Sequence, residues 1–303
     1  MAARGARGLP PLQPLIQTMN PTGTLCYAGA GINALLSAPK MTEFLGGLPK
    51  LHETLPNMVR MLALRHPGLE FSIWQMLNRL VVDKPSVEDF LDDRRHHDAQ
   101  EFITSMLDSV GDLLPPDLGA QWRQIFNINI TTEYTCDGPA KHRSMRSQKE
   151  SILSMPVRNQ SNEQPIKSLG EAFSNYLLNQ WVERQCGQCD SKRSHQRVSI
   201  PNQPKVLFVH YMRFKTVVRG KEIFSIKIKH PITAKPRLTV KNKTYNLVGV
   251  LRHKGESANS GHYYFTSIWA PYNITGLAFR INNDDEPKKI DPGASHFFRK
   301  RFF

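Results

Sequence analysis

The chain has 303 residues, and 40% of them are hydrophobic, which is enough apolar material for one large domain or two small ones. No stretch approaches the ~18 consecutive apolar residues of a membrane helix, so the sequence excludes a membrane-spanning protein. Four cysteines are too few for a disulfide scaffold, and we therefore expect a reducing compartment, either the cytoplasm or the nucleus.

The net charge of +14 is concentrated in the second part of the chain. Residues 191–303 contain 22 Lys and Arg against 6 Asp and Glu, whereas residues 1–190 are nearly balanced. One interpretation is an anionic partner, such as nucleic acid or an acidic protein. The other is a solvated basic surface that keeps the protein soluble, and this second interpretation is favoured because the Lys and Arg residues are scattered.

The first part of the chain is predicted to be helical. Residues 1–18 are rich in Pro and Gly and predict a flexible lead-in. Helix-forming segments follow at 32–45, with a break at Pro39, and at 53–81 and 86–114. The last segment contains a capping box, in which Asp98 accepts the N–H of the residue three positions on and Glu101 reaches back. Apolar residues then recur at helical spacing as far as Val110.

The second part of the chain is predicted to be mainly strands. The pattern predicts one further helix, Leu169 to Trp181. The predicted strands lie at 126–136, 151–157, 197–200, 206–211, 224–228, 245–251 and 262–269. Helices first and strands second is typical of an α+β fold, with a helical subdomain packed on an antiparallel sheet.

Three local features could carry chemistry. Cys26 follows a flexible turn and begins a helix, where the helix dipole favours a thiolate, although a lone cysteine is more often a small buried hydrophobe. His262 follows a glycine- and serine-rich loop at the start of a strand, where it could serve as a general base or only end the loop. The polar run 282–285 could orient that histidine or form an Asx-rich turn.

Taken together, these features resemble the ubiquitin-specific proteases, a family of papain-like cysteine peptidases. Five sequence boxes carry the resemblance, in the family's order, between about residues 20 and 290. They are 23–27 (GTLCY), 97–102 (HDAQEF), 204–214 (PKVLFVHYMRF), 245–255 (YNLVGVLRHKG), and 260–263 (SGHY) with 283–284 (ND).

The resemblance implies a fold with a helical thumb, a β palm and a zinc-ribbon-like finger. It places a catalytic domain at 19–295, with the thumb at about 26–120, the finger at 122–200 and the palm at 200–295, followed by a basic tail at 296–303. It also implies hydrolysis of the isopeptide or peptide bond at the C-terminal glycine of ubiquitin or a ubiquitin-like modifier, and no cofactor for catalysis.

Residue roles follow from the same resemblance. Cys26 would attack, His262 would take and return the proton, and Asn283 or Asp284 would orient His262. Pro21 stands where the family has an oxyanion-donating Asn and has no donor to offer, so the oxyanion donors would include Asn20, one residue further away, and Thr24, which replaces another Asn of the family. The residues implied in binding the modifier tail are Asp98, Glu101, His253 and Tyr263.

A metal site is implied in the finger. Cys186 and Cys189 form a CxxC knuckle, and Cys136 is what remains of the family's second pair. Tetrahedral zinc takes four ligands, which three cysteines and His142 could supply. We expect the knuckle on a turn between two short strands, near Cys136. The alternative is a metal-free ribbon.

Two rival functions stay open. Pro21 and Thr24 depart from the family's pattern, which is compatible with a weak enzyme or with an inactive relative that binds ubiquitin. The basic second part of the chain is compatible with a scaffold associated with nucleic acid or chromatin.

Overall fold

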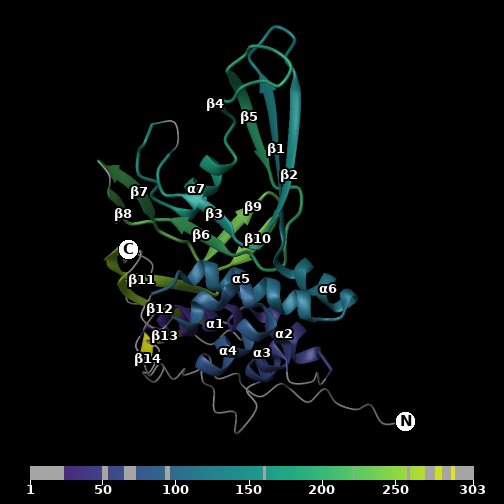
Figure 1. The fold of residues 1–303 in the computed structure, drawn as a ribbon, viewed down its shortest axis with the longest axis vertical. Helices are drawn as coiled ribbons and strands as arrows, with labels where there is room; N and C mark the ends of the chain where they lie inside the picture. The colour runs from purple at the N-terminus through teal and green to yellow at the C-terminus, as the bar shows by residue number, and fades with distance from the viewer. Residues whose placement is uncertain are drawn as a thin grey trace.

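The computed structural model describes residues 24–49, 54–64, 73–92, 96–159, 162–220, 222–257, 260–269, 277–281 and 288–290. The predicted lead-in and basic tail lie outside these residues. The helices of the first part gather in one layer, in the lower half of Figure 1. They are α1 (Cys26–Leu36), α2 (Pro39–Gly47), α3 (Leu55–Leu64), α4 (Ile73–Asp83), the 3-10 helix η1 (Pro85–Leu91), α5 (Ala99–Leu113) and α6 (Pro116–Phe126).

Helix α1 is buried along almost its whole length, and its small residues allow this. A Cβ atom added to Gly31 would lie 2.7 Å from the ring of Phe102, so only glycine lets α5 approach α1 this closely. Phe102, Ile103 and Met106 belong to the buried stripe of α5 that the helical spacing predicts. This packing fixes the start of α1, where Cys26 lies.

Four antiparallel strands form a sheet that rises away from the helices, and we call it the upright sheet (Figure 1). Its strands, in spatial order, are β2 (Arg143–Glu150), β1 (Ile128–Cys136), β5 (Arg193–Ser199) and β4 (Gln180–Glu183). Apolar residues at its base, including Ile128 and Ile130, form a second core with β3 (Leu153–Pro156) and with α7 (Leu169–Tyr176). The far end of the sheet is polar and carries two tight turns.

Three strand pairs connect the upright sheet to the rest of the molecule. The pairs are the parallel β3 (Leu153–Pro156) and β6 (Val209–Met212), and the antiparallel β7 (Phe214–Arg219) with β8 (Glu222–Lys227) and β9 (Arg237–Val240) with β10 (Lys243–Asn246). The parallel pair is a departure from the predicted antiparallel sheet. A parallel pair is possible here because β3 and β6 lie more than fifty residues apart in the chain and no hairpin forces them to be antiparallel.

A last antiparallel sheet packs directly on the helices. Its strands are β11 (Gly249–Ser257), β12 (Ser260–Trp269), β13 (Leu277–Ile281) and β14 (Lys288–Ile290). Tyr263 and Phe265 on β12 are part of the same apolar core as α1 and α5. The first and last parts of the described chain are therefore held together, in a mixed fold of helices and sheets.

Several predicted boundaries are wrong. The helix predicted at 169–181 ends at Tyr176, and Trp181 lies on β4, where it pairs with His195 of β5. The strand predicted at 245–251 is two strands, because Leu247 leaves the pairing with β9 and donates its N–H to the carbonyl of Pro236. No described helix combines the length and the apolar composition needed to cross a membrane.

Candidate active site and metal cluster

Cys26 is the first residue of α1, and its side chain is fully buried. The backbone N–H of Tyr263 on β12 donates a hydrogen bond to the Cys26 Sγ atom, with an N–S distance of 3.3 Å. These two residues are 237 positions apart in the chain. Because His262 immediately precedes Tyr263, the fold brings the strand that carries the predicted base to the predicted nucleophile.

The resting Cys26 side chain is a neutral thiol. Burial raises its pKa, and the hydrogen bond from the Tyr263 N–H opposes this effect without cancelling it. Burial therefore opposes the thiolate that the start of a helix would otherwise favour. For Cys26 to act as a nucleophile, a nearby base has to accept its proton.

Asp98, in the sequence box 97–102, is connected to Cys26 through Tyr263. Its Oδ1 atom accepts the N–H groups of Gln100 at 2.7 Å and Glu101 at 3.2 Å, which confirms the predicted cap at the start of α5. Its Oδ2 atom accepts the hydroxyl of Tyr263 at 3.1 Å. Tyr263 therefore contacts Cys26 through its backbone and Asp98 through its side chain.

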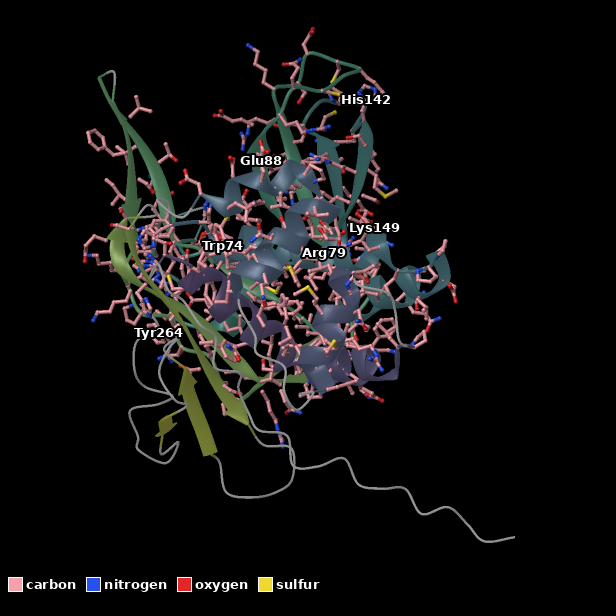
Figure 2. All side chains as sticks on the ribbon, turned by 60° about the horizontal axis from the view of Figure 1, so that its bottom comes forward. Trp74, Arg79, Glu88, His142, Lys149 and Tyr264 are labelled. Atoms are coloured by element: carbon pink, nitrogen blue, oxygen red, sulfur yellow. The ribbon has the colours of Figure 1, made fainter. Side chains whose placement is uncertain are left out.

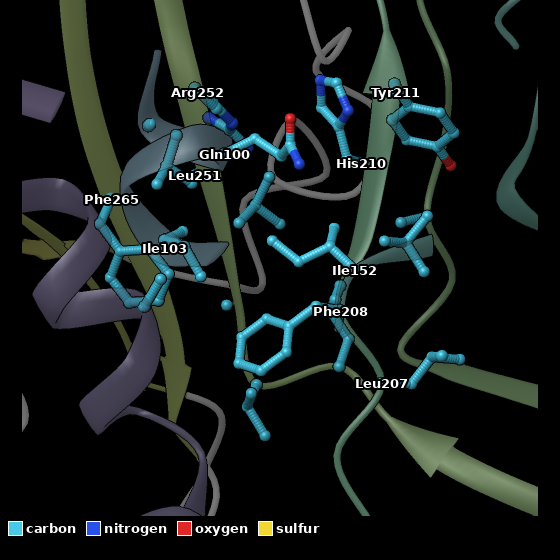
Figure 3. Close-up of a pocket in the computed structure, with 18 of the residues that line it drawn as sticks. Gln100, Ile103, Ile152, Leu207, Phe208, His210, Tyr211, Leu251, Arg252 and Phe265 are labelled. Carbon is cyan, nitrogen blue, oxygen red and sulfur yellow. The ribbon is translucent and has the colours of Figure 1, made fainter. Parts of the chain in front are cut away.

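A cleft of about 320 Å³ lies next to this centre, between α5 and the strands β6 and β11 (Figure 3). Asp98, His253 and Tyr263 contribute to its walls, as the sequence predicts for residues that bind substrate. The fourth predicted residue, Glu101, is exposed on α5 and is not among the residues that line the cleft.

Sequence reasoning missed several cleft residues. Figure 3 shows Gln100, His210 and Arg252 at one end of the cleft and apolar residues such as Phe208 at the other. His210 Nδ1 lies 3.2 Å from the hydroxyl of Ser154, and burial lowers the pKa of His210. The box 204–214 already contained His210, but its strand pattern does not tell which residues face a cleft.

The remaining predicted site residues are only partly described. Thr24 is half-buried, two positions before Cys26. Asn20, Asn283 and Asp284 lie outside the described residues.

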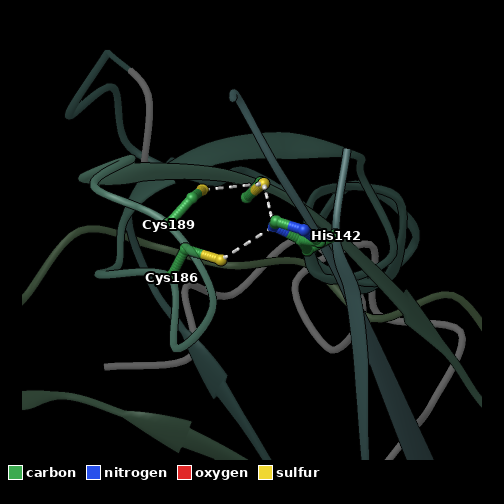
Figure 4. A group of neighbouring side chains, drawn as sticks. His142, Cys186 and Cys189 are labelled. Carbon is green, nitrogen blue, oxygen red and sulfur yellow. Dashed lines mark hydrogen bonds between the residues drawn. The ribbon is translucent and has the colours of Figure 1, made fainter. Parts of the chain in front are cut away.

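The four predicted metal ligands come together at the tip of the upright sheet (Figure 4). Figure 2 shows His142 at this tip, far from Tyr264 on β12. Cys136 ends β1, and the two knuckle cysteines lie on the turn between β4 and β5, as predicted. The ligand atoms of Cys136, His142, Cys186 and Cys189 all lie within 4.8 Å of one another.

The spacing of these atoms fits a tetrahedral ion. The Sγ atoms of Cys136 and Cys189 are 3.8 Å apart, and His142 Nδ1 is 3.8 Å from Cys136 Sγ and 3.7 Å from Cys186 Sγ. A tetrahedron with Zn–S bonds of about 2.3 Å has sulfur–sulfur edges of about 3.8 Å. The N–H of Gln188 donates to Cys186 Sγ at 3.4 Å and lowers the pKa of that thiol to about 6, which favours the thiolate that binds metal.

A family model described as ubiquitin carboxyl-terminal hydrolase matches residues 19–293. This chain therefore belongs to that family, in agreement with the five sequence boxes and with the Cys26–Tyr263 contact.

Two curated relatives resemble the chain at low identity. The chain is 23% identical over 244 residues to ubiquitin carboxyl-terminal hydrolase 12 of Salmo salar. The aligned region covers 69% of this chain and 63% of that protein. It is also 27% identical over 188 residues to ubiquitin carboxyl-terminal hydrolase 26 of Arabidopsis thaliana. Here the aligned region covers 57% of this chain and 17% of that protein. The matched part is thus less than two thirds of either relative.

Proposed function

We propose that this chain is a cysteine peptidase that hydrolyses the isopeptide or peptide bond after the C-terminal glycine of ubiquitin or a ubiquitin-like modifier. The observation that carries the proposal is the hydrogen bond from the Tyr263 N–H to Cys26 Sγ, because it joins two of the family's sequence boxes at one atom. In this proposal the helical layer is the thumb, the upright sheet is the finger, and the strands between them form the palm.

The reaction proceeds in two balanced steps. His262 accepts the proton of Cys26, and the sulfur forms a bond to the glycine carbonyl carbon. The bond from that carbon to the amine then breaks, and His262 returns its proton to the leaving amine. Water, deprotonated by His262, hydrolyses the thioester and restores the thiol. Asn283 or Asp284 orients His262 in this proposal.

The negative charge that develops on the carbonyl oxygen needs hydrogen-bond donors. We assign this role to Asn20 and Thr24. Loss of one such donor typically costs ~10²–10³ in rate, so an imperfect set of donors still leaves a working enzyme.

The test is turnover of ubiquitin that carries a fluorogenic group on its C-terminus. Wild-type protein is expected to release the fluorophore, and Cys26→Ala is expected to abolish release while its circular dichroism spectrum stays unchanged. Ubiquitin with a C-terminal electrophile should label Cys26 and nothing in the Cys26→Ala variant. A folded wild-type protein that binds ubiquitin but shows neither turnover nor labelling would instead be the inactive, ubiquitin-binding relative.

We further propose that the cleft beside Asp98 receives the C-terminal tail of the modifier. Asp98, His253 and Tyr263 line it, and the carboxylate of Asp98 can pair with an arginine of the tail, as the resemblance implies for Asp98 and Glu101.

Two substitutions separate the charge of Asp98 from its capping role. Asp98→Asn keeps a good N-cap and removes the charge, whereas Asp98→Ala removes both. A hydrogen bond to a charged group contributes ~1.5–3 kcal/mol, so Asp98→Asn should weaken tail binding about tenfold or more with little change in the melting temperature. If a folded Asp98→Asn variant has an unchanged KM, Asp98 does not bind the tail and acts only as the N-cap of α5.

We also propose that Cys136, His142, Cys186 and Cys189 hold a structural zinc ion. The ion would tie the β1–β2 turn to the β4–β5 turn, and it would take no part in the reaction. The distances within the cluster and the lowered pKa of Cys186 support the proposal.

Metal analysis of the purified protein tests this site. One zinc per chain is expected in the wild type and none in Cys186→Ser, which should also melt at a lower temperature. Ser144→Ala, on the neighbouring strand β2, serves as the control and should keep its zinc. If the wild-type protein is folded, contains no zinc and binds none on titration, the zinc proposal is wrong and the alternative of a metal-free ribbon holds.

A further inference from the structure

Lys227, the last residue of β8, is buried although it carries a charge: its exposed fraction is 8%. Its ammonium donates to the carbonyl of His253 at 2.7 Å and to the carbonyl of Gly255 at 3.1 Å. The third contact is with His253 Nδ1, also at 3.1 Å. An ammonium has three N–H donors, and all three are directed at the end of β11.

The contact with Nδ1 defines the state of the His253 ring. Lys227 can only donate, so Nδ1 accepts and the proton of the neutral ring lies on Nε2. Burial, and then the charge of Lys227, lower the pKa of His253 to about 4, which agrees with a neutral ring. Phe214 lies edge-on to this ring, with 5.7 Å between the centroids.

The His253 ring in turn packs against the backbone that carries His262. A Cβ atom added to Gly261 would lie 2.4 Å from His253 Nε2, so the ring rests directly on that glycine. Gly261 has a φ of 142°, in the region that favours glycine, and it immediately precedes His262. The ring centroids of His253 and Tyr263 are 4.7 Å apart, so the residue after His262 is in contact as well.

The other side of the same segment is fixed by the nucleophile. The Tyr263 N–H is bonded to Cys26 Sγ, and its hydroxyl is bonded to Asp98. His262 therefore lies between a glycine held by the His253 ring and a tyrosine held by Cys26 and Asp98.

We propose that Lys227 is a positioning residue: its ammonium holds the His253 ring against Gly261 and so fixes the backbone that presents His262 beside Cys26. The inference rests on the function proposed above and adds a residue that lies outside the five sequence boxes. Lys227 is among the residues that line the cleft, but its ammonium is bonded to β11, so it acts through His253 and does not touch the reacting atoms.

The test compares two lysines that lie two positions apart. Lys227→Met removes the ammonium and keeps a long apolar side chain. Lys229→Met is the matched control, because Lys229 is about half exposed and pairs with the exposed Glu256. In the fluorogenic ubiquitin assay, Lys227→Met should lower kcat by on the order of 10²-fold with KM little changed, because a small misplacement of a catalytic group costs about this much. Lys229→Met should match the wild type.

A second readout does not depend on turnover. Iodoacetamide reacts with the thiolate form of cysteine, and mass spectrometry of the Cys26 peptide follows this one site among the four cysteines. Lys227→Met should change the alkylation rate of Cys26, because the backbone of Tyr263, which covers the buried sulfur and donates to it, is displaced. Lys229→Met should leave that rate unchanged.

Folded Lys227→Met with wild-type kcat overturns the inference and leaves the proposed function intact. If Lys227→Met does not fold, Lys227→Arg replaces it. That variant keeps the charge, but a planar guanidinium cannot reproduce the three contacts, so a fall in kcat is again expected and wild-type kcat overturns the inference. If the wild-type chain shows no turnover, the proposed function fails, and unchanged alkylation of Cys26 in the Lys227 variant then overturns the positioning role separately.

Discussion

The helical layer and the strand region of this protein are stabilised in different ways. In the helical layer, apolar side chains from α1, α5 and their neighbours form one large core that also includes β12. In the strand region, long cationic side chains reach back to backbone carbonyls. Lys241 donates to Ile200, and Lys243 donates to Gln203 and Pro204. Arg213 similarly donates to the carbonyls of Ile228 and His230.

The difference follows from the size of the sheets. Two-stranded sheets and short strands leave many carbonyls without a partner in a ladder, and a buried carbonyl without a hydrogen bond is costly. Lysine and arginine can cover apolar surface with their stems while their ends satisfy these carbonyls. Part of the positive charge of the second half is therefore a structural feature, whether or not an anionic partner also binds it.

The largest expected effect is in the helical core. Phe102→Ala removes a fully buried ring that packs edge-on against Tyr27 and Phe90. The free energy of unfolding in urea should fall by ~3–5 kcal/mol, because a cavity remains. Leu113→Ala, near the exposed end of the same helix, is the control and should change it much less. Equal losses would mean that the core does not carry the stability of this layer.

The strand region should respond to the loss of a cation. Lys243→Met removes the lysine donor from the Gln203 carbonyl and one of the two donors of the Pro204 carbonyl, which keeps the Tyr245 hydroxyl, and it should lower the free energy of unfolding by ~1–3 kcal/mol. Lys40→Met is the matched control in the helical layer, where Lys40 only pairs with the exposed Glu43, and such pairs contribute ~0.5 kcal/mol or less. If both variants lose the same amount, the two regions do not differ in their use of charge.

Acid should act on the strand region through its histidines. Burial lowers the pKa values of His210, His230 and His253, the last from 6.5 to about 4. Between these pH values the unfolded chain binds more protons than the folded one, so stability is complete above pH 6.5 and is lost as the pH falls toward 4. For His253, which is half-buried, the loss should be on the order of 1 kcal/mol. The free energy of unfolding of His253→Gln, measured in urea, should depend less on pH than that of the wild type. An unchanged pH dependence would mean that His253 is not its source.

The smallest expected effect is a gain in stability. A Cβ atom added to Gly170, the second residue of α7, would meet nothing within 4 Å. Gly170→Ala should therefore raise the free energy of unfolding by ~0.5–1 kcal/mol, because alanine loses less backbone entropy in a helix. Gly249→Ala is the contrasting variant, since its Cβ atom would collide with the ring of Phe265 and should destabilise the protein.

The sequence predicts the features that local rules control. The cap at Asp98, the stripe that begins at Phe102 and the turn that carries Cys186 and Cys189 depend on neighbouring residues, and the structure has all of them. The family's sequence boxes pointed to Cys26 and to the segment 260–263, and the structure joins these two at the hydrogen bond from Tyr263 to Cys26.

What the sequence could not predict depends on long-range packing. Strand β2 has a polar, exposed sequence at a sheet edge and shows no apolar alternation. Helix α6, which begins at Pro116, was not predicted as a separate helix. The burial that raises the pKa of Cys26, and the buried ammonium of Lys227, arise from partners more than twenty residues away.

The distance along the chain between Cys26 and Tyr263 also has a consequence for biosynthesis. On the ribosome, Cys26 emerges long before β12, because 237 residues separate the two partners of that hydrogen bond. A nascent chain therefore carries the thiol without its partner strand throughout translation of the upright sheet and of the strand pairs that follow it. Any product that ends before Tyr263 lacks the contact at Cys26.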